Sequence, residues 1–187
     1  MERYLLENTE PYKLLVQRFK PPHRKVAERI QKGINPTTSV VARIRPILDE
    51  EVSSGQVVAA FPRDGEDDTV DVHELLRVIR GLPAINSSTY RLGKVFSTDS
   101  TTQEVYYDII QPLLPYAGEG NVGTLFAFGQ TGSGKTFAIS QLERLVAKAL
   151  FGGTLQGEKR VHVSVFELAG NSAFGESCRK KLSVLHD

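Results

Sequence analysis

GQTGSGKTF, residues 129–137, is the stretch of this sequence that decides the fold. It satisfies the pattern G-x-x-x-x-G-K-[ST], in which glycines let backbone amides face phosphate oxygens and let the ligand approach closely. In this pattern Lys135 reaches the β- and γ-phosphates, the Thr136 hydroxyl binds Mg²⁺, and the following helix N-terminus favours negative charge. The sequence therefore predicts a nucleotide site. Its phosphate-wrapping residues are Gly129, Gln130, Thr131, Gly132, Ser133 and Gly134.

The residues on either side of the loop have the context that this motif requires. Upstream, NVGTLFAFG (121–129) is a nearly unbroken apolar run, typical of a strand buried on both faces of a parallel sheet. Downstream, apolar residues recur at helical spacing until Gly152–Gly153, where a helix is expected to end. The apolar helix positions are Leu142, Leu145, Val146, Ala149 and Leu150.

Helices and strands are predicted to alternate along the rest of the chain. Two short helices are expected within 1–35, broken by Pro21 and Pro22 and ending at Gly33 and Pro36. A further helix begins with a capping box formed by Thr101 and Glu104, and Pro112 or Pro115 is expected to limit or kink it. Strands are expected at 37–46, 88–96 and 160–168. We interpret the acidic stretch 49–68 as loop or small strands, and INSSTYR (85–91) as a turn. The order predicts an α/β fold with the doubly wound mixed sheet of P-loop NTPases.

The composition is that of an ordinary globular protein. Of 187 residues, 40% are hydrophobic and 24% are charged, and the net charge of +1 gives no global field favouring nucleic acid or membrane. No apolar run is long enough to cross a bilayer, and the single Cys178 excludes an internal disulfide. We expect an intracellular, soluble protein that binds no nucleic acid and has no membrane span.

Charge is distributed unevenly along the chain. Residues 1–33 carry eight Lys or Arg against four Glu, and residues 49–74 carry nine acids against Arg63 alone. Two interpretations stay open. The first is a solvated basic helix followed by an acidic surface loop, and the second is a basic neck that meets an acidic partner surface.

Longer stretches resemble the kinesin motor-domain family. FAFGQTGSGKTF (126–137) is similar to the family's phosphate loop, and TTQEVYYDIIQPLL (101–114) to its Gln-x-x-Val-Tyr helix. VVARIRPI (40–47) is similar to the first kinesin strand, which carries Arg-x-Arg-Pro. The resemblance covers about residues 38–187. It implies a basic helical neck at 1–36 and the N-terminal part of a kinesin-like motor domain at 37–187.

The resemblance also implies ligands and partners. Arg43, Arg45 and Pro46 are expected to hold adenine, because a guanidinium plane stacks on an aromatic base and proline forms a rigid wall. The implied cofactors are ATP and Mg²⁺, the implied partner is the microtubule, and the implied location is the cytoplasm and its cytoskeleton. Phe137, which completes the loop, stands where the family usually has His.

One feature points towards a class within the family. VHELLRV (72–78) and the basic lead-in resemble the microtubule-depolymerising class, although Arg77, Val78 and Ile79 stand where that class carries Lys-Val-Asp. Within the family, the resemblance therefore weakly favours the microtubule-depolymerising class.

Two family segments that surround the γ-phosphate are not found in their proper place. They are a Ser-Ser-Arg-Ser-His stretch and an Asp-Leu-Ala-Gly-Ser-Glu stretch. ELAGNS (167–172) is similar to the second, but Glu167 is one methylene longer than the Asp, and the stretch aligns better with a strand end. We interpret the chain as stopping partway through a motor domain and expect nucleotide binding with impaired hydrolysis, so no catalytic residue is assigned.

Two alternatives to the motor domain stay open from the sequence. One is a non-hydrolysing nucleotide-binding module that docks a partner through its basic N-terminus. The other is an unrelated small P-loop GTPase in which ELAG (167–170) is the second switch.

Overall fold

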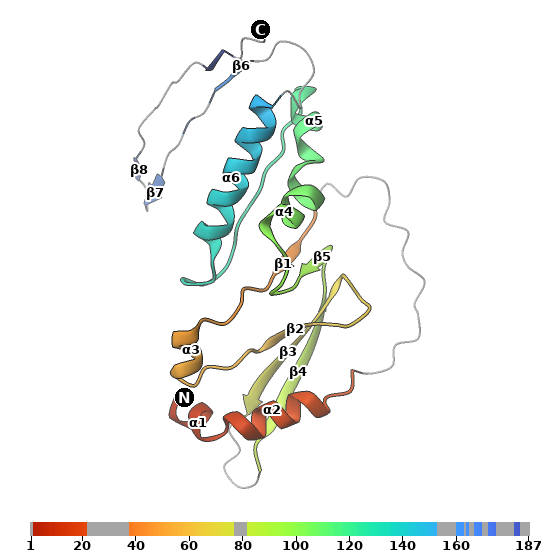
Figure 1. The fold of residues 1–187 in the computed structure, drawn as a ribbon, viewed down its shortest axis with the longest axis vertical. Helices are drawn as coiled ribbons and strands as arrows, with labels where there is room; N and C mark the ends of the chain where they lie inside the picture. The colour runs from red at the N-terminus through yellow and green to blue at the C-terminus, as the bar shows by residue number, and fades with distance from the viewer. Residues whose placement is uncertain are drawn as a thin grey trace. The chain divides into compact units, whose positions relative to one another are not determined.

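The computed structural model describes residues 2–21, 38–76 and 82–152, together with 160–162, 164, 167–169, 172–174 and 182–183. The chain divides into two compact units, Met1–Ser100 and Thr101–Asp187. Parallel and antiparallel strands occur together with helices (Figure 1), which confirms the predicted mixed α/β class. The described strands form four small sheets, with the orders β1-β5, β2-β3-β4, β6-β9 and β7-β8.

An antiparallel sheet of order β2-β3-β4 is the centre of the first unit. Its strands are β2 (Ala60–Pro62), β3 (Thr69–Leu76) and β4 (Ala84–Arg91). The predicted turn at 85–91 is wrong, because these residues lie in β4. Their polar side chains are accommodated by polar partners on β3: Ser87 Oγ lies 2.8 Å from His73 Nδ1, and the Thr89 hydroxyl donates to Asp71.

Helices α1 (Glu2–Glu7) and α2 (Thr9–Arg18) both lie before Pro21, where the sequence predicts a single helix, and the helix predicted after Pro22 falls outside the described residues. The α2 helix packs on the sheet through Tyr12, whose hydroxyl lies 2.8 Å from the Val58 carbonyl and 3.2 Å from that of His73. Burial of Tyr12 raises its pKa to about 12. Residues 22–36 of the predicted neck lie outside the described residues, and the domain boundary at 36/37 stays a prediction.

A parallel pair of strands carries the Arg-x-Arg-Pro stretch. Strand β1 (Val41–Arg43) pairs with β5 (Lys94–Phe96), so the predicted strand at 37–46 is confirmed with shorter bounds. The predicted strand at 88–96 is divided between β4 and β5. A Cβ at Gly93, which lies between them, would meet Ser39 Oγ at 2.7 Å and the carbonyl oxygen of Val40 at 3.0 Å. This close approach requires glycine.

The second unit begins with consecutive helical segments: α4 (Thr102–Val105), a π-helical turn η1 (Tyr106–Ile110) and α5 (Leu113–Gly118). The predicted capping box is confirmed. The Glu104 amide donates to Thr101 Oγ1, the Thr101 amide donates to a Glu104 carboxylate oxygen, and both distances are 3.2 Å. Pro112 directly precedes α5, as expected for a residue that limits a helix.

The predicted helix after the glycine loop is confirmed as α6 (Lys135–Phe151), which is capped by Gly152. The helix α6 contacts α4 and η1, and its Leu142 is buried. Apolar side chains of α4, η1 and α5 in the same unit are also buried. These are Val105, Tyr106, Ile110 and Leu114.

The strand predicted at 121–129 is wrong, since Figure 1 shows an irregular segment leading into α6. Phe126 and Phe128 of this segment are 88% and 101% exposed. An apolar run indicates a tendency towards burial, but a strand also requires a neighbour whose backbone pairs with it. None of the paired strands in the described part of the chain includes these residues.

The described residues beyond α6 form short strands. β6 (Arg160–Val161) pairs with β9 (Leu182–Ser183), and β7 (Glu167–Ala169) pairs with β8 (Ser172–Phe174), both antiparallel. The single strand predicted at 160–168 is interrupted, because His162 lies outside any strand. Cys178 and the Arg77–Ile79 stretch fall outside the described residues.

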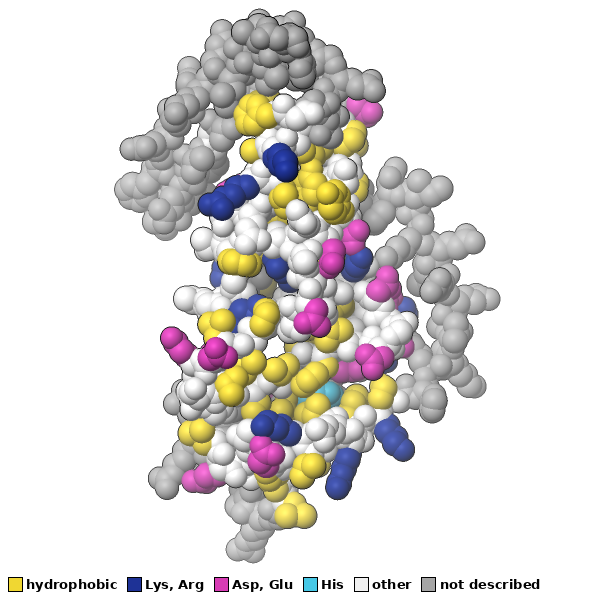
Figure 2. All heavy atoms as spheres, in the orientation of Figure 1, with side chains coloured by type: hydrophobic (Ala, Val, Ile, Leu, Met, Phe, Trp, Pro, Cys, Tyr) yellow, Lys and Arg dark blue, Asp and Glu magenta, His cyan; other side chains and the backbone are white. Residues whose placement is uncertain are grey.

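Basic and acidic side chains are interspersed on the face shown in Figure 2. Among the described helices, none is both long and apolar enough to pass through a lipid bilayer.

Candidate nucleotide-binding site

The phosphate loop enters α6 through glycines with unusual backbone angles. Gly129, Gly132 and Gly134 have φ angles of 155°, 83° and 88°, and Gly134 is the N-cap of α6 in the left-handed conformation. Within the loop, the Ser133 amide donates to the Gln130 carbonyl at 3.1 Å. The chain thus makes a tight turn directly onto the positive end of a 17-residue helix.

The Lys135 side chain is held against the loop that precedes it. Its Nζ donates to the carbonyl oxygens of Gly129 at 2.8 Å and Gln130 at 2.9 Å. The ammonium therefore lies beside the loop backbone that the motif assigns to phosphate oxygens. A phosphate group there would meet both this charge and the start of α6.

The remaining polar side chains of the loop are accessible. Gln130, Thr131, Ser133 and Thr136 are exposed, and so is the aromatic Phe137. The structure thus places the whole predicted set from Gly129 to Phe137 in one turn and the first turn of α6, where Thr136 is an exposed residue.

The residues present fit a metal ion that arrives with phosphates. Among the described residues, no cluster of three or more His, Cys, Asp or Glu could hold a metal ion. Thr136 carries a hydroxyl oxygen, the kind of ligand that Mg²⁺ prefers, and at nucleotides this ion ordinarily takes its other ligands from phosphates and water.

The predicted adenine residues lie in the first unit. Arg43 ends β1 opposite Phe96, and the Ile44 amide donates to the Phe96 carbonyl at 2.9 Å. Pro46 is exposed, as a wall for a base needs to be. Arg45 forms two hydrogen bonds to Glu51, one of them from Nη1 at 2.8 Å, and Nη1 also donates to the Pro46 carbonyl at 2.9 Å.

Glu51 is the residue that the sequence analysis did not identify. It lies on α3 (Asp49–Ser53), so the interpretation of the acidic stretch 49–68 as loop or small strands is wrong for these five residues. Its carboxylate accepts hydrogen bonds from Arg45 and, at 2.9 Å, from the Leu48 amide. These bonds, first that of Arg45, lower the pKa of Glu51 to about 2, and the bond to Glu51 raises the pKa of Arg45. The spacing of Glu51 three residues after the helix N-cap is the sequence signal that could have found it.

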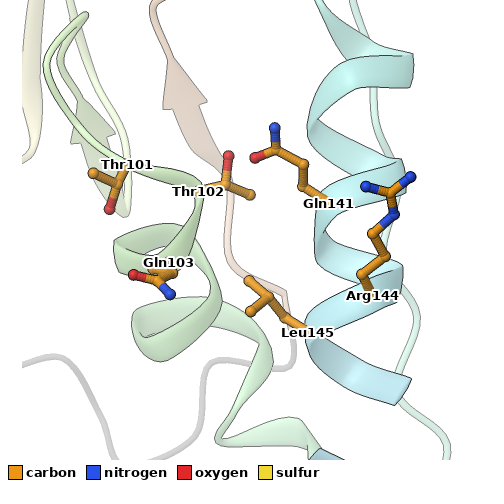
Figure 3. A pocket seen from close by; sticks show the side chains of 6 residues that line it. All are labelled: Thr101, Thr102, Gln103, Gln141, Arg144 and Leu145. Carbon is orange, nitrogen blue, oxygen red and sulfur yellow. The ribbon is translucent and has the colours of Figure 1, made fainter. Parts of the chain in front are cut away.

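A pocket lies beside α6, the helix that follows the phosphate loop. It has a volume of about 370 Å³ and lies between the start of α4 and the middle of α6. Figure 3 shows that Gln141 and Leu145 point towards α4, whereas the guanidinium of Arg144 is turned away. Thr101, Thr102 and Gln103 form the opposite wall. Its lining does not overlap the phosphate loop.

Comparison with known proteins identifies the family. The family model described as the kinesin motor domain matches residues 43–172. The chain is 30% identical over 156 residues to the human (Homo sapiens) kinesin-like protein KIF24, covering 78% of this chain and 11% of that protein. It is 32% identical over 127 residues to the Arabidopsis thaliana kinesin-like protein KIN-14I, covering 68% of this chain and 12% of that protein.

A third relative is the diatom spindle kinesin-1 of Cylindrotheca fusiformis, at 28% identity over 145 residues, or 73% of this chain and 22% of that protein. The chain thus matches about a tenth to a fifth of the length of these relatives. The family match begins at Arg43, runs through the phosphate loop and covers more than half of the 187 residues, so this chain belongs to the kinesin motor-domain family.

Proposed function

We propose that this chain supplies the ATP-binding part of a kinesin motor whose activity is microtubule-based movement or destabilisation of microtubule ends. The observation that carries the proposal is the turn from Gly129 to Gly134, which leads directly into α6 and holds the Lys135 ammonium beside its backbone. The match to the kinesin family favours this function over an unrelated GTPase and over a docking module.

Each group in the site has a separate task. Backbone amides of 129–134 and the start of α6 bind phosphate oxygens, and Lys135 neutralises the β- and γ-phosphates. The Thr136 hydroxyl is one ligand of Mg²⁺, which neutralises phosphate charge when it is bound. Arg43, Arg45 and Pro46 hold the adenine, and Arg45 is itself bound to Glu51.

Hydrolysis needs further groups around the γ-phosphate. The 187 residues contain no Ser-Ser-Arg-Ser-His or Asp-Leu-Ala-Gly-Ser-Glu stretch. We propose that this chain by itself binds Mg·ATP and hydrolyses it slowly. Its sites of action are the cytoplasm and the microtubule cytoskeleton, and the lean towards the depolymerising class stays a prediction.

The test compares two lysine substitutions on one helix. Calorimetric titration with Mg·ATP is expected to show binding to the wild-type chain and a loss of at least about tenfold in affinity for Lys135→Ala, because a hydrogen-bonding charge is removed. Lys148→Ala, an exposed site near the other end of α6, is the control and is expected to bind normally. Unchanged ATP affinity in Lys135→Ala would refute the assignment.

Two further measurements separate the alternatives. Preference for GTP over ATP would favour the GTPase. Sedimentation of the wild-type chain with polymerised tubulin, with and without Mg·ATP, tests the microtubule partner. Absence of co-sedimentation under both conditions would confine the function of this chain to nucleotide binding.

A further inference from the structure

The turn that carries Pro46 is held at both ends by one carboxylate. Residues 45–48 connect β1 to α3, and Glu51 accepts hydrogen bonds from the Arg45 guanidinium at the start of this turn and from the Leu48 amide at its end. The Arg45 Nη1 also donates to the carbonyl of Pro46 at 2.9 Å. Glu51 thus binds the Leu48 backbone directly, and through the Arg45 guanidinium it is connected to the Pro46 carbonyl.

The carboxylate itself is placed by regular structure. Glu51 lies in the first turn of α3, where the Val52 amide donates to the Leu48 carbonyl at 3.0 Å and the Ser54 amide to the Glu50 carbonyl at 3.0 Å. The Arg45 and Glu51 side chains are 31% and 21% exposed, so water competes only partly for their bonds. A two-point bond between guanidinium and carboxylate fixes orientation as well as distance.

From these contacts we infer that Glu51 is a positioning residue for the base-binding wall: through Arg45 and the Leu48 amide it holds Pro46, and the end of β1 at Arg43, in the arrangement that an adenine stacks against. This inference rests on the proposed function. Glu51 contacts no part of the nucleotide in this scheme. Its contribution is that the wall is ordered before the base arrives, so the base does not have to order it on binding.

The inference separates two parts of the same ligand. Inorganic tripolyphosphate carries the phosphates of ATP without a base, so it reports on the phosphate loop alone. We expect Glu51→Gln to weaken Mg·ATP binding by about three- to tenfold, the effect of ordering one or two further groups. Binding of magnesium tripolyphosphate is expected to stay unchanged. Glu50→Gln, an exposed neighbour on α3, is the matched control and is expected to change neither affinity.

A second variant tests whether ATP affinity depends on the two-point bond between the Arg45 guanidinium and the Glu51 carboxylate. Arg45→Lys keeps the positive charge but replaces the planar two-point donor by a single ammonium. It is expected to reproduce the selective loss for ATP. Because the two side chains act as one unit, the double variant Arg45→Lys/Glu51→Gln is expected to lose no more than either single variant, whereas independent sites would give multiplied losses.

The outcomes distinguish a failure of the positioning role of Glu51 from a failure of the proposed ATP-binding function. If the wild-type chain binds tripolyphosphate but shows no gain from the adenosine of ATP, both the adenine assignment and the inference fail. If the wild-type chain prefers ATP and Glu51→Gln retains that preference in full, the proposed function stands and the inference is overturned. It is also overturned if Glu51→Gln weakens both ligands equally, since that result assigns Glu51 a general role in folding.

Discussion

The substitution Asp71→Ala is expected to destabilise the first unit more than any other single carboxylate removal in its sheet. Asp71 lies on β3 opposite Phe61 and Thr89 and is 5% exposed. It accepts two hydrogen bonds from Arg63, from Nε at 2.9 Å and from Nη2 at 2.5 Å, and one from the Thr89 hydroxyl. The Arg63 side chain is 9% exposed.

The magnitude follows from what the substitution leaves behind. Removal of the carboxylate strands the Arg63 guanidinium among buried groups, with Thr89 Oγ1 at 2.9 Å and the more distant Glu66 at 3.8 Å as its remaining partners. Breaking one side of a buried ion pair costs about 3–5 kcal/mol of the free energy of unfolding. Because a small domain has a total of about 5–15 kcal/mol, the variant should be largely unfolded in mild denaturant.

The assay is urea denaturation followed by circular dichroism, since the chain contains no tryptophan. Asp64→Ala is the matched control, because it removes an exposed carboxylate from the connection between β2 and β3. It is expected to change the free energy of unfolding by less than about 0.5 kcal/mol. A loss below about 1 kcal/mol for Asp71→Ala, comparable to that of the control, would show that the buried ion pair does not stabilise the sheet and would refute the reasoning.

Two smaller effects are predicted by the same approach. Thr101→Ala removes the acceptor of the Glu104 amide and is expected to cost about 1 kcal/mol in the free energy of unfolding. Gln103→Ala, at an exposed position in the same helical turn, is the control. Equal losses of stability in the two variants would argue against the capping box. His73 gives a pH dependence. Burial lowers its pKa below the usual 6.5, against the opposing charge of Asp71, so the unfolded chain binds a proton first. Stability is therefore expected to be complete above about pH 6.5 and to fall as the pH drops below that value, and urea curves at several pH values should lose this slope in His73→Gln.

Patterns set by neighbours in sequence were predictable. The capping box at Thr101 and the helix that begins at Lys135 depend on residues within a few positions of each other, and both were found from the sequence. The phosphate loop belongs to the same class, since its glycines and Lys135 lie within seven consecutive residues.

Strand β4 was not predictable in this way. Its residues INSSTYR carry polar side chains that favour turns, and sequence reasoning assigned them to one. They form a strand because Ser87 and Thr89 lie opposite His73 and Asp71, polar residues 14 and 18 positions away. A buried polar group that finds its partner stabilises the pairing, and one that does not find it would oppose it. The sequence of one strand alone cannot tell these cases apart.

The same distinction separates the phosphate loop from the Arg-x-Arg-Pro turn. The phosphate loop is built from consecutive residues, so its motif can be recognised from the sequence alone. In the Arg-x-Arg-Pro turn, Arg45 is held by Glu51, six positions away on another element, within an acidic stretch that resembled ordinary solvated surface. An Arg-x-Arg-Pro stretch without such a carboxylate would have the same letters and a less ordered wall. The proposed recognition of adenine would therefore depend on Glu51 as well as on the Arg-x-Arg-Pro residues.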